Sequence, residues 1–407
     1  MRDSSDGPAS HSGVVAARWR REFGLGGSGA PESTKDEDDP AAQAPGDRVI
    51  QAREAMVRLV KERFGGDGAL IDQVRSLVLS ASEALAALDE AGAASVPATT
   101  QLEALEAVVV FDGTRPSFRL REDEIDFDSS FNTGTWKRQL NPFLARLAEH
   151  AACVGRVEVN GRHQATAFLV TPTLAITNRH VAQAIATFAN GTITMSEGCT
   201  LDFGREDGTG RKSFDQRRII DIRFAGDADI ISPIDHERLD LAVLQVSKSK
   251  LSGAAGQRLL VVGGTTASEL VDDARFVAAV GYPTDPELVV PEQVWTEYGK
   301  VIRKLLEGDG GAKRLAPGQP MDSPRDGLTT WTATHDATTI SGNSGSPLLA
   351  FPVAGAASRA AGLHYGGRSG GDRVNWAHLL HYAGAKTGYG TQGLFADFCN
   401  REGIELV

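Results

Sequence analysis

From Cys153 to about residue 385 the sequence alternates short apolar runs with glycine turns. This pattern is typical of short antiparallel strands. The chain has 45 glycines and only 6% aromatic residues, which also fits a fold with many turns. The part before Cys153 lacks the pattern. We therefore expect a mainly β domain that is preceded by a smaller N-terminal part.

The N-terminal part divides into a polar tail and a helical segment. Residues 1–45 are rich in Gly, Ser, Pro and acidic residues, so they are predicted to be a disordered tail. Residues 47–64 and 69–91 carry apolar residues at helical spacing and predict a helical hairpin module over 46–92. Two helices alone make a poor core. They either extend the main domain or serve as an adaptor or regulatory module that binds a protein partner.

The next segment, 93–150, is predicted to be a linker and an extension that packs on the main domain. It contains an apolar β-branched run over 104–111, which predicts extended structure, and a turn at Asp112-Gly113. Residues 136–150 have helical spacing. At the other end of the chain, residues 391–407 are predicted to hold a terminal helix.

Ser344 lies in the stretch GNSGSP, which begins at Gly342. A serine between glycines predicts a tight turn, since glycine accepts backbone angles that a side chain forbids. Such a turn can present the Ser344 hydroxyl and aim the N–H groups of Gly342 and Ser344 at a developing oxyanion. Serines in glycine-rich loops are mostly structural. The turn therefore gains meaning only if a base and a carboxylate occur elsewhere.

His180 and Asp240 are the candidates for these two roles. His180 directly follows a predicted strand pair over 166–170 and 174–177, and Asp240 directly precedes the apolar strand LAVL. Either residue alone is more often structural. Their chain order, His180, Asp240, Ser344, is the order used by the double β-barrel serine proteases, whereas unrelated hydrolases use other orders.

The segment 153–385 resembles the trypsin-like serine proteases, and within them the bacterial glutamyl-endopeptidase-like branch. The resemblance rests on TNRHVA around His180, DLAVL from Asp240, GYP at 281–283, GNSGSP from 342 and GLHYGG at 362–367. It implies two six-stranded antiparallel barrels, over about 151–250 and 258–385, in a protease domain spanning 151–390. It covers a little over half of the chain.

The resemblance also implies the chemistry of the site. Ser344 would attack a peptide carbonyl, His180 would act as the base and Asp240 would orient His180. The N–H groups of Gly342 and Ser344 would form the oxyanion hole. No metal or cofactor is required. Asn343 stands where trypsin-type zymogens carry an aspartate, so we do not expect their activation switch.

Two further positions match the substrate pocket of the glutamyl-endopeptidase-like branch. Thr339 lies five residues before Ser344, and His364 lies in the GLHYGG strand. A hydroxyl and an imidazole can both donate hydrogen bonds to a carboxylate. The pair therefore suggests cleavage after Glu or Asp. The alternative is that His364 only fills the wall of the pocket.

The net charge, the cysteines and the hydropathy of the sequence argue against several other classes of protein. The net charge of −11 argues against a nucleic-acid or anionic-membrane binder. The three cysteines have neither a disulfide pattern nor metal-ligand spacing. No apolar run is long enough for a signal peptide or a membrane span, so we expect a cytoplasmic protein.

The sequence therefore predicts a regulated intracellular serine endopeptidase that acts on proteins or peptides, such as a bacterial defence or stress effector. The regulation is suggested by the N-terminal module together with the cytoplasmic location. The alternative is a protein with a protease fold that serves as a binding or adaptor module and has little or no catalytic activity.

Overall fold

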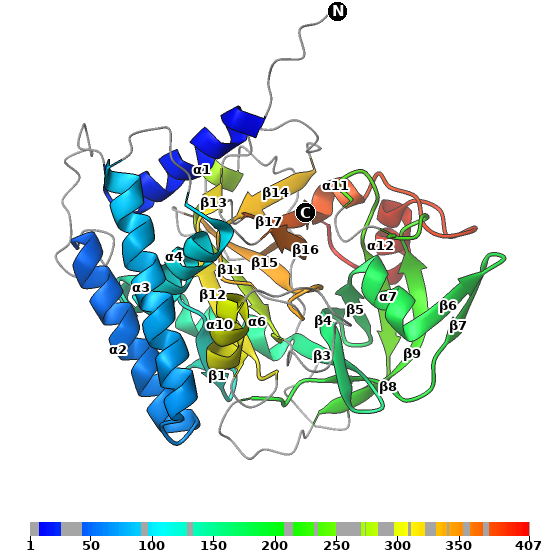
Figure 1. The fold of residues 1–407 in the computed structure, drawn as a ribbon. Coiled ribbons are helices and arrows are strands. Elements are labelled where there is room, and N and C mark those ends of the chain that lie inside the picture. Colours follow the sequence, from blue (N-terminus) through cyan, green and yellow to red (C-terminus); the bar gives the residue numbers. More distant parts are fainter. Residues whose placement is uncertain are drawn as a thin grey trace, which may run out of the picture.

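The structure, a computed structural model, describes residues 8–25, 43–90, 97–127, 133–206, 215–231, 235–249, 270–272, 274–283, 297–307, 311–321, 331–339, 342–352, 359–368 and 374–406. In these ranges it contains two antiparallel β-barrels, with a group of helices on the side of the second barrel (Figure 1). Within the same ranges, no helix combines the length and the apolar character needed to cross a membrane.

Six strands form the first barrel and close in the order β10-β5-β4-β3-β8-β9. Their bounds are β3 (Val154–Val159), β4 (Arg162–Thr171), β5 (Leu174–Thr177), β8 (Cys199–Asp202), β9 (Gln216–Ala225) and β10 (Ala242–Val246). The predicted strand pair before His180 is present as β4 and β5, which pair in antiparallel register. Between β5 and β8 the chain forms α7 (Arg179–Ile185) and the hairpin of β6 (Ala186–Ala189) and β7 (Thr192–Met195).

The second barrel is the main part of a nine-stranded sheet. Its strands are β11 (Ala274–Gly281), β12 (Arg314–Gly318), β13 (Pro320–Met321), β14 (Thr332–His335), β15 (Pro347–Pro352), β16 (Arg359–Arg368) and β17 (Val374–Leu379). The strands β12 and β13 are one chain segment that bends at Gln319. β12 pairs with β11 and β13 pairs with β14, so this bent segment completes the ring. The predicted double six-stranded barrel is confirmed.

The N-terminal extension adds to the second barrel at β12. The hairpin of β1 (Phe118–Arg121) and β2 (Glu124–Ile125) pairs with β12 through β1. The helical segment that follows consists of α5 (Trp136–Leu140), a 3-10 turn (Asn141–Phe143) and α6 (Leu144–Ala152). The extension therefore packs on the main domain as part of its sheet.

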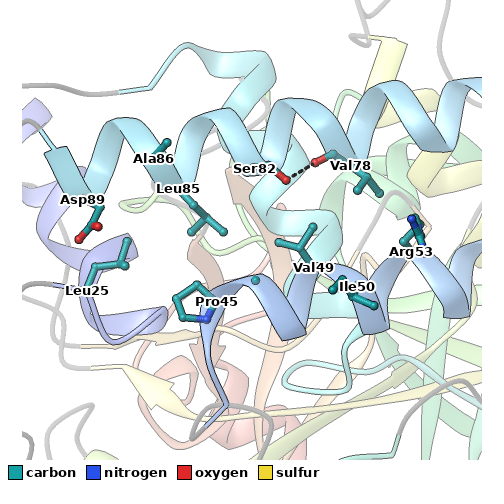
Figure 2. A pocket seen from close by; sticks show the side chains of 11 residues that line it. Leu25, Pro45, Val49, Ile50, Arg53, Val78, Ser82, Leu85, Ala86 and Asp89 are labelled. Carbon is teal, nitrogen blue, oxygen red and sulfur yellow. Dashed lines mark hydrogen bonds between the residues drawn. The ribbon is translucent and has the colours of Figure 1, made fainter.

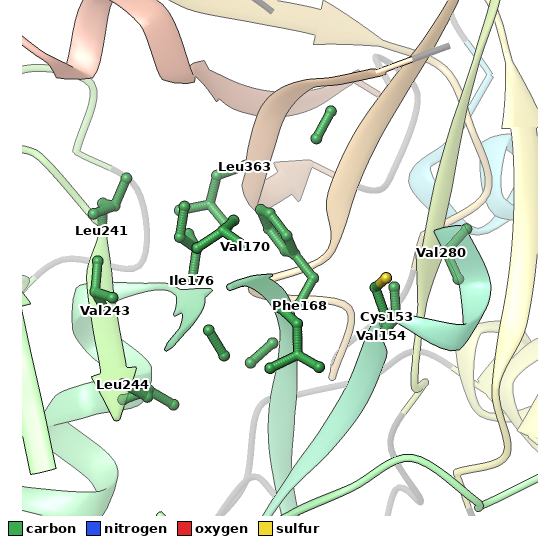
Figure 3. Close-up of a cluster of buried hydrophobic side chains, with 14 of the residues drawn as sticks. Cys153, Val154, Phe168, Val170, Ile176, Leu241, Val243, Leu244, Val280 and Leu363 are labelled. Atoms are coloured by element: carbon green, nitrogen blue, oxygen red, sulfur yellow. The ribbon is translucent and has the colours of Figure 1, made fainter. Parts of the chain in front are cut away.

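One hydrophobic core joins the two barrels. Phe168 and Ile176 from the first barrel belong to the same buried cluster as Val280 and Leu363 from the second, as Figure 3 shows. Burial of this shared apolar surface is the main force that fixes one barrel against the other. At the C-terminus, α11 (Leu380–Ala383) follows β17, and the predicted terminal helix is present as α12 (Phe395–Glu402).

A second hydrophobic core lies among the helices. It is formed by α1 (Pro8–Glu22), α2 (Pro45–Arg63), α3 (Gly68–Glu90), α4 (Thr99–Phe111) and α10 (Glu297–Glu307). We call α1 to α4 the helical module. The helix α10 comes from the connection between β11 and β12, and its Leu305 is fully buried in the helical core. The β domain thus contributes one helix to the core of the module.

Two sequence predictions for this region are wrong. The helix α1 lies inside the predicted disordered tail, and both Trp19 in this helix and Phe23 directly after it are buried. Its apolar residues pack on the other helices. The prediction was wrong because it used the average composition of residues 1–45, in which these few apolar residues carry little weight. The apolar β-branched run over 104–111 is helical, not extended, because α4 is surrounded by other helices and is buried on all sides. Tertiary packing here outweighs the local β preference.

The outer side of the α2–α3 hairpin has a groove. Figure 2 shows Val49 and Ile50 of α2 facing Val78 and Leu85 of α3 across it, with Leu25 at one end. Ile50 is 49% exposed. One side of the hairpin is therefore buried against α4 and α10, while this side is open.

Candidate active site

His180 and Asp240 are brought together by the pairing of β5 with β10. Thr177, the last residue of β5, lies opposite Ala242, the first residue of β10. The Nδ1 atom of His180 lies 2.7 Å from Oδ2 of Asp240. The backbone N–H of His180 also donates to Oδ1 of Asp240 at 2.9 Å. Both carboxylate oxygens of Asp240 therefore fix the orientation of His180.

The contact between His180 and Asp240 shifts the pKa values of both side chains. Burial disfavours the imidazolium, but the charge and the hydrogen bond of Asp240 outweigh burial and raise the pKa of His180 above its usual 6.5. Burial likewise favours the protonated carboxyl, but the charge of His180 and its two hydrogen bonds lower the pKa of Asp240. The side chain of His180 remains 35% exposed, and that of Asp240 only 4%. The imidazole can thus exchange protons with a substrate while Asp240 stays ionised and shielded.

The backbone of Asp240 is held from both barrels. Its N–H donates to Nε2 of His378 on β17 at 3.1 Å, and its carbonyl accepts from Asn178 Nδ2 at 2.9 Å. The ring of His378 is stacked between Trp331 and Tyr365. Burial lowers the pKa of His378 to about 3, so the ring stays neutral and its Nε2 can accept. Sequence analysis did not find His378, because no local motif marks it.

Ser344 lies on a turn between two glycines with left-handed backbone angles. The φ angles are 87° at Gly342 and 88° at Gly345. A Cβ on Gly345 would lie 1.9 Å from the carbonyl oxygen of Thr166 and 2.6 Å from Oγ1 of Thr177. Only glycine fits there. The turn is thereby packed against the end of β5, three residues before His180.

Hydrogen bonds to Thr166 hold this turn on the first barrel. The N–H of Thr166 donates to the carbonyl of Ser344 at 2.9 Å, and its Oγ1 donates to the carbonyl of Gly342 at 2.8 Å. In the described part of the chain, the N–H groups of Gly342 and Ser344 make no hydrogen bond. That these two groups form an oxyanion hole stays a prediction.

The Ser344 side chain is half-buried. No hydrogen bond joins its hydroxyl to His180 among the residues that the structure describes. A contact of this kind is often long before substrate binds and shortens in the complex. The structure thus joins His180 to Asp240 directly, and the backbone contacts of the Ser344 turn hold this turn against the first barrel.

The two predicted pocket residues differ in their hydrogen bonding. The hydroxyl of Thr339 donates to Oδ1 of Asn375 at 2.6 Å, so its single proton is already used. The Nδ2 of the same asparagine donates to the carbonyl of Ala337 at 2.7 Å, which fixes the orientation of the amide. His364 is 3% exposed, and its Nδ1 makes no hydrogen bond within the described residues. Of the two, His364 is the one with an unused polar atom.

The described residues contain no group of three or more His, Cys, Asp or Glu side chains that could hold a metal ion. Cys153, Cys199 and Cys399 are buried and form no disulfide. The pair His335 and Asp336 has other contacts than the catalytic candidates: Asp336 forms an ion pair with Arg115, and His335 packs against His364.

Comparisons with known proteins found a family model, a relative and a solved structure that are similar to this chain. A family model described as the trypsin-like peptidase domain matches residues 165–351. A probable serine protease of Lysobacter enzymogenes is 31% identical over 287 residues, which are 66% of this chain and 70% of that protein. Among solved structures, the inactive form of the Rv3671c protease covers 60% of this chain and 89% of that chain, with 17% identity and a TM-score of 0.32.

The raised pKa of His180 leads to a pH prediction that does not depend on activity. In a Ser344→Ala variant, an NMR titration of the His180 ring should have its midpoint above 6.5. Adding Asp240→Asn removes the negative charge, and burial alone should then bring the midpoint below 6.5. Equal midpoints in the two proteins would contradict the ion pair.

Proposed function

We propose that this chain, which belongs to the trypsin-like serine proteases, is an active endopeptidase with His180, Asp240 and Ser344 as its catalytic residues. The observation that carries the proposal is the double hydrogen bond between His180 and Asp240 at the end of β5. The glycine turn of Ser344 is packed against the same strand end. A base, its orienting carboxylate and a serine on a tight turn are the parts that acyl transfer needs.

The reaction follows from these roles. Oγ of Ser344 attacks the peptide carbonyl carbon while Nε2 of His180 takes its proton. The carbonyl oxygen becomes an oxyanion and is stabilised by the N–H groups of Gly342 and Ser344, each worth about 3 kcal/mol. The C–N bond then breaks, and His180 gives its proton to the leaving amine. This leaves an ester between the substrate and Ser344.

Water completes the cycle. His180, now neutral, accepts a proton from a water molecule as its oxygen attacks the ester carbon. A second oxyanion forms in the same hole, the ester C–O bond breaks, and Ser344 regains its proton from His180. Asp240 remains ionised throughout and stabilises the imidazolium in both steps. No step uses a metal or a cofactor.

For the residue before the scissile bond, P1, we propose Glu or Asp, as in the glutamyl-endopeptidase-like branch. The support comes from His364, because its buried Nδ1 lacks a partner among the described residues and a bound carboxylate would supply one. Burial and the nearby His335 lower the pKa of His364 well below 6.5, so the free pocket carries no charge from this ring. We assign Thr339 a different role from the one suggested by the sequence. Its hydroxyl proton is donated to Asn375 and is not available to the substrate, so Thr339 shapes the wall of the substrate pocket.

Regulation is part of the proposal. A protease that acts in the cytoplasm must be restrained, and we propose a defence or stress effector whose activity depends on a protein partner of residues 46–92. The support is the open groove between α2 and α3. An active-site probe that labels the isolated chain as fast as the chain in a lysate of its host would argue against such a restraint.

A fluorophosphonate probe tests the nucleophile. It should label the wild-type chain at Ser344, and Ser344→Ala should abolish labelling and lower peptide turnover by about a million-fold. Ser346→Ala is the matched control, because Ser346 is buried two positions away and its hydroxyl has no partner in the described part of the chain. This control should keep labelling. Absence of labelling in the wild type under all conditions would favour the alternative, a binding or adaptor protein with a protease fold.

A P1 substrate library tests the pocket. Peptides with Glu at P1 should be cleaved faster than isosteric Gln peptides, and His364→Leu should reduce this preference by about tenfold, the order expected for one hydrogen bond to a charge. Thr339→Val should reduce it less, since the Thr339 proton serves Asn375. Equal or faster cleavage after Arg or Leu would overturn the proposed acidic pocket.

A further inference from the structure

A short segment, 336–339, directly follows β14, and Arg115 holds it at two points. The guanidinium Nε of Arg115 lies 3.2 Å from Oδ2 of Asp336. The backbone carbonyl of Arg115 accepts a hydrogen bond from Thr338 Oγ1 at 2.7 Å. The other oxygen of Asp336, Oδ1, accepts from the N–H of Gln319 at 2.6 Å, at the bend between β12 and β13.

The opposite side of the segment is held by Asn375 on β17. Its amide bonds the carbonyl of Ala337 and the hydroxyl of Thr339. Asp336 and Thr338 are therefore held by Arg115, and Ala337 and Thr339 by Asn375. The segment ends at Thr339, the predicted wall of the substrate pocket.

Arg115 is in turn fixed by the helical module. Its guanidinium forms an ion pair with the carboxylate of Glu22, at the C-terminal end of α1. The turn that carries Arg115 is clamped by Arg48 of α2, whose Nε donates to Asp112 Oδ2 at 2.7 Å and whose Nη2 donates to Thr114 Oγ1 at 2.9 Å. Nη1 of Arg48 also donates to the carbonyl of Glu22 at 2.6 Å.

These charges are largely removed from water. The exposed fractions of the side chains are 6% for Arg115, 15% for Glu22 and 14% for Asp336. Solvent and salt screen such pairs poorly, so the orientation of each charge depends on its partners. Loss of the Arg115 charge would remove the ion pair of Asp336 and one of the ion pairs of Glu22, whose Oε1 also lies 3.8 Å from Nη2 of Arg48. The segment 336–339 would then lose its fixed position on this side.

We propose that Arg115 is a positioning residue through which α1 and α2 set the geometry of the substrate pocket. The inference deepens the proposed function and rests on it for its effect on catalysis. It assigns the helical module a part in the active site: Glu22 orients Arg115, Arg115 holds Asp336 and Thr338, and these hold Thr339. The module is thus a support for the pocket, in addition to any partner that it binds.

The test compares Arg115→Met, which keeps most of the side-chain volume and removes the charge, with Arg115→Lys, which keeps the charge. Arg75→Met is the control, because Arg75 forms an exposed ion pair with Asp72 far from this segment. The first readout is hydrogen exchange in a Ser344→Ala background, so it needs no activity. Arg115→Met should speed exchange at 336–339 by about tenfold or more, without change in β5 and β10. In Arg115→Lys, the exchange rate at 336–339 should lie between the rates in Arg115→Met and in the control.

The second readout separates positioning from a general loss of stability. Arg115→Met in the chain with Ser344 intact should lower kcat/KM for a peptide substrate more than it lowers the rate of labelling by a small fluorophosphonate that has no P1 side chain. A purely structural role would lower both rates by the same factor, the fraction of folded protein, and would overturn the proposal. Unchanged exchange at 336–339 would also overturn it.

If Arg115→Met does not fold, Glu22→Gln is tested by the same two readouts, because it removes the carboxylate charge that pairs with Arg115 and leaves the direct hydrogen bonds of Arg48 to Asp112 and Thr114 in place. A wild-type chain that neither cleaves peptides nor reacts with the probe would refute the proposed function. The exchange experiment would still support or overturn the positioning role of Arg115 in that case, so the two failures are distinguishable.

Discussion

The site depends on the hydrogen bonds of one buried residue, Thr166 on β4. Its N–H and its hydroxyl donate to the carbonyls of Ser344 and Gly342 in the second barrel. Its hydroxyl accepts from the N–H of Tyr282, and its carbonyl accepts from Thr177 at the end of β5. Each polar atom of Thr166 thus has a partner, as a buried polar group requires. The turn of the proposed nucleophile, the second barrel and the strand that leads to His180 all meet at this residue.

The second barrel makes the complementary contact. His378 on β17 accepts a hydrogen bond from the backbone N–H of Asp240 in the first barrel, so each barrel holds a proposed catalytic residue of the other. The shared hydrophobic core holds the barrels together without specifying an exact alignment, because the hydrophobic effect is non-directional. The directional hydrogen bonds of Thr166 and His378 supply that alignment. The helical module adds a third support behind the pocket through Arg115.

The residues of the proposed site that lie in local motifs could be singled out from the sequence, whereas the residues that hold them through tertiary contacts could not. His180, Asp240 and Ser344 each occur in a recognisable strand-and-turn context, and the double barrel followed from the same motifs. Thr166 is 176 positions from Gly342, and nothing in the residues around it marks the contact. Arg115 was missed for the same reason. The helix over Thr99–Phe111 was misread because its β-branched residues fit a strand locally, whereas helices surround it in the fold.

The most direct measurement is a crystal structure of the chain after reaction with a peptidyl phosphonate that carries Glu at P1. If the proposed function is right, the phosphorus is bonded to Oγ of Ser344, and one phosphonyl oxygen lies about 2.7–3.1 Å from the N–H groups of Gly342 and Ser344. Nε2 of His180 lies within hydrogen-bond distance of Oγ, and the carbonyls of Ser344 and Gly342 still accept from Thr166. An adduct on another residue, or a phosphonyl oxygen that points away from both N–H groups, would contradict the proposed catalytic site.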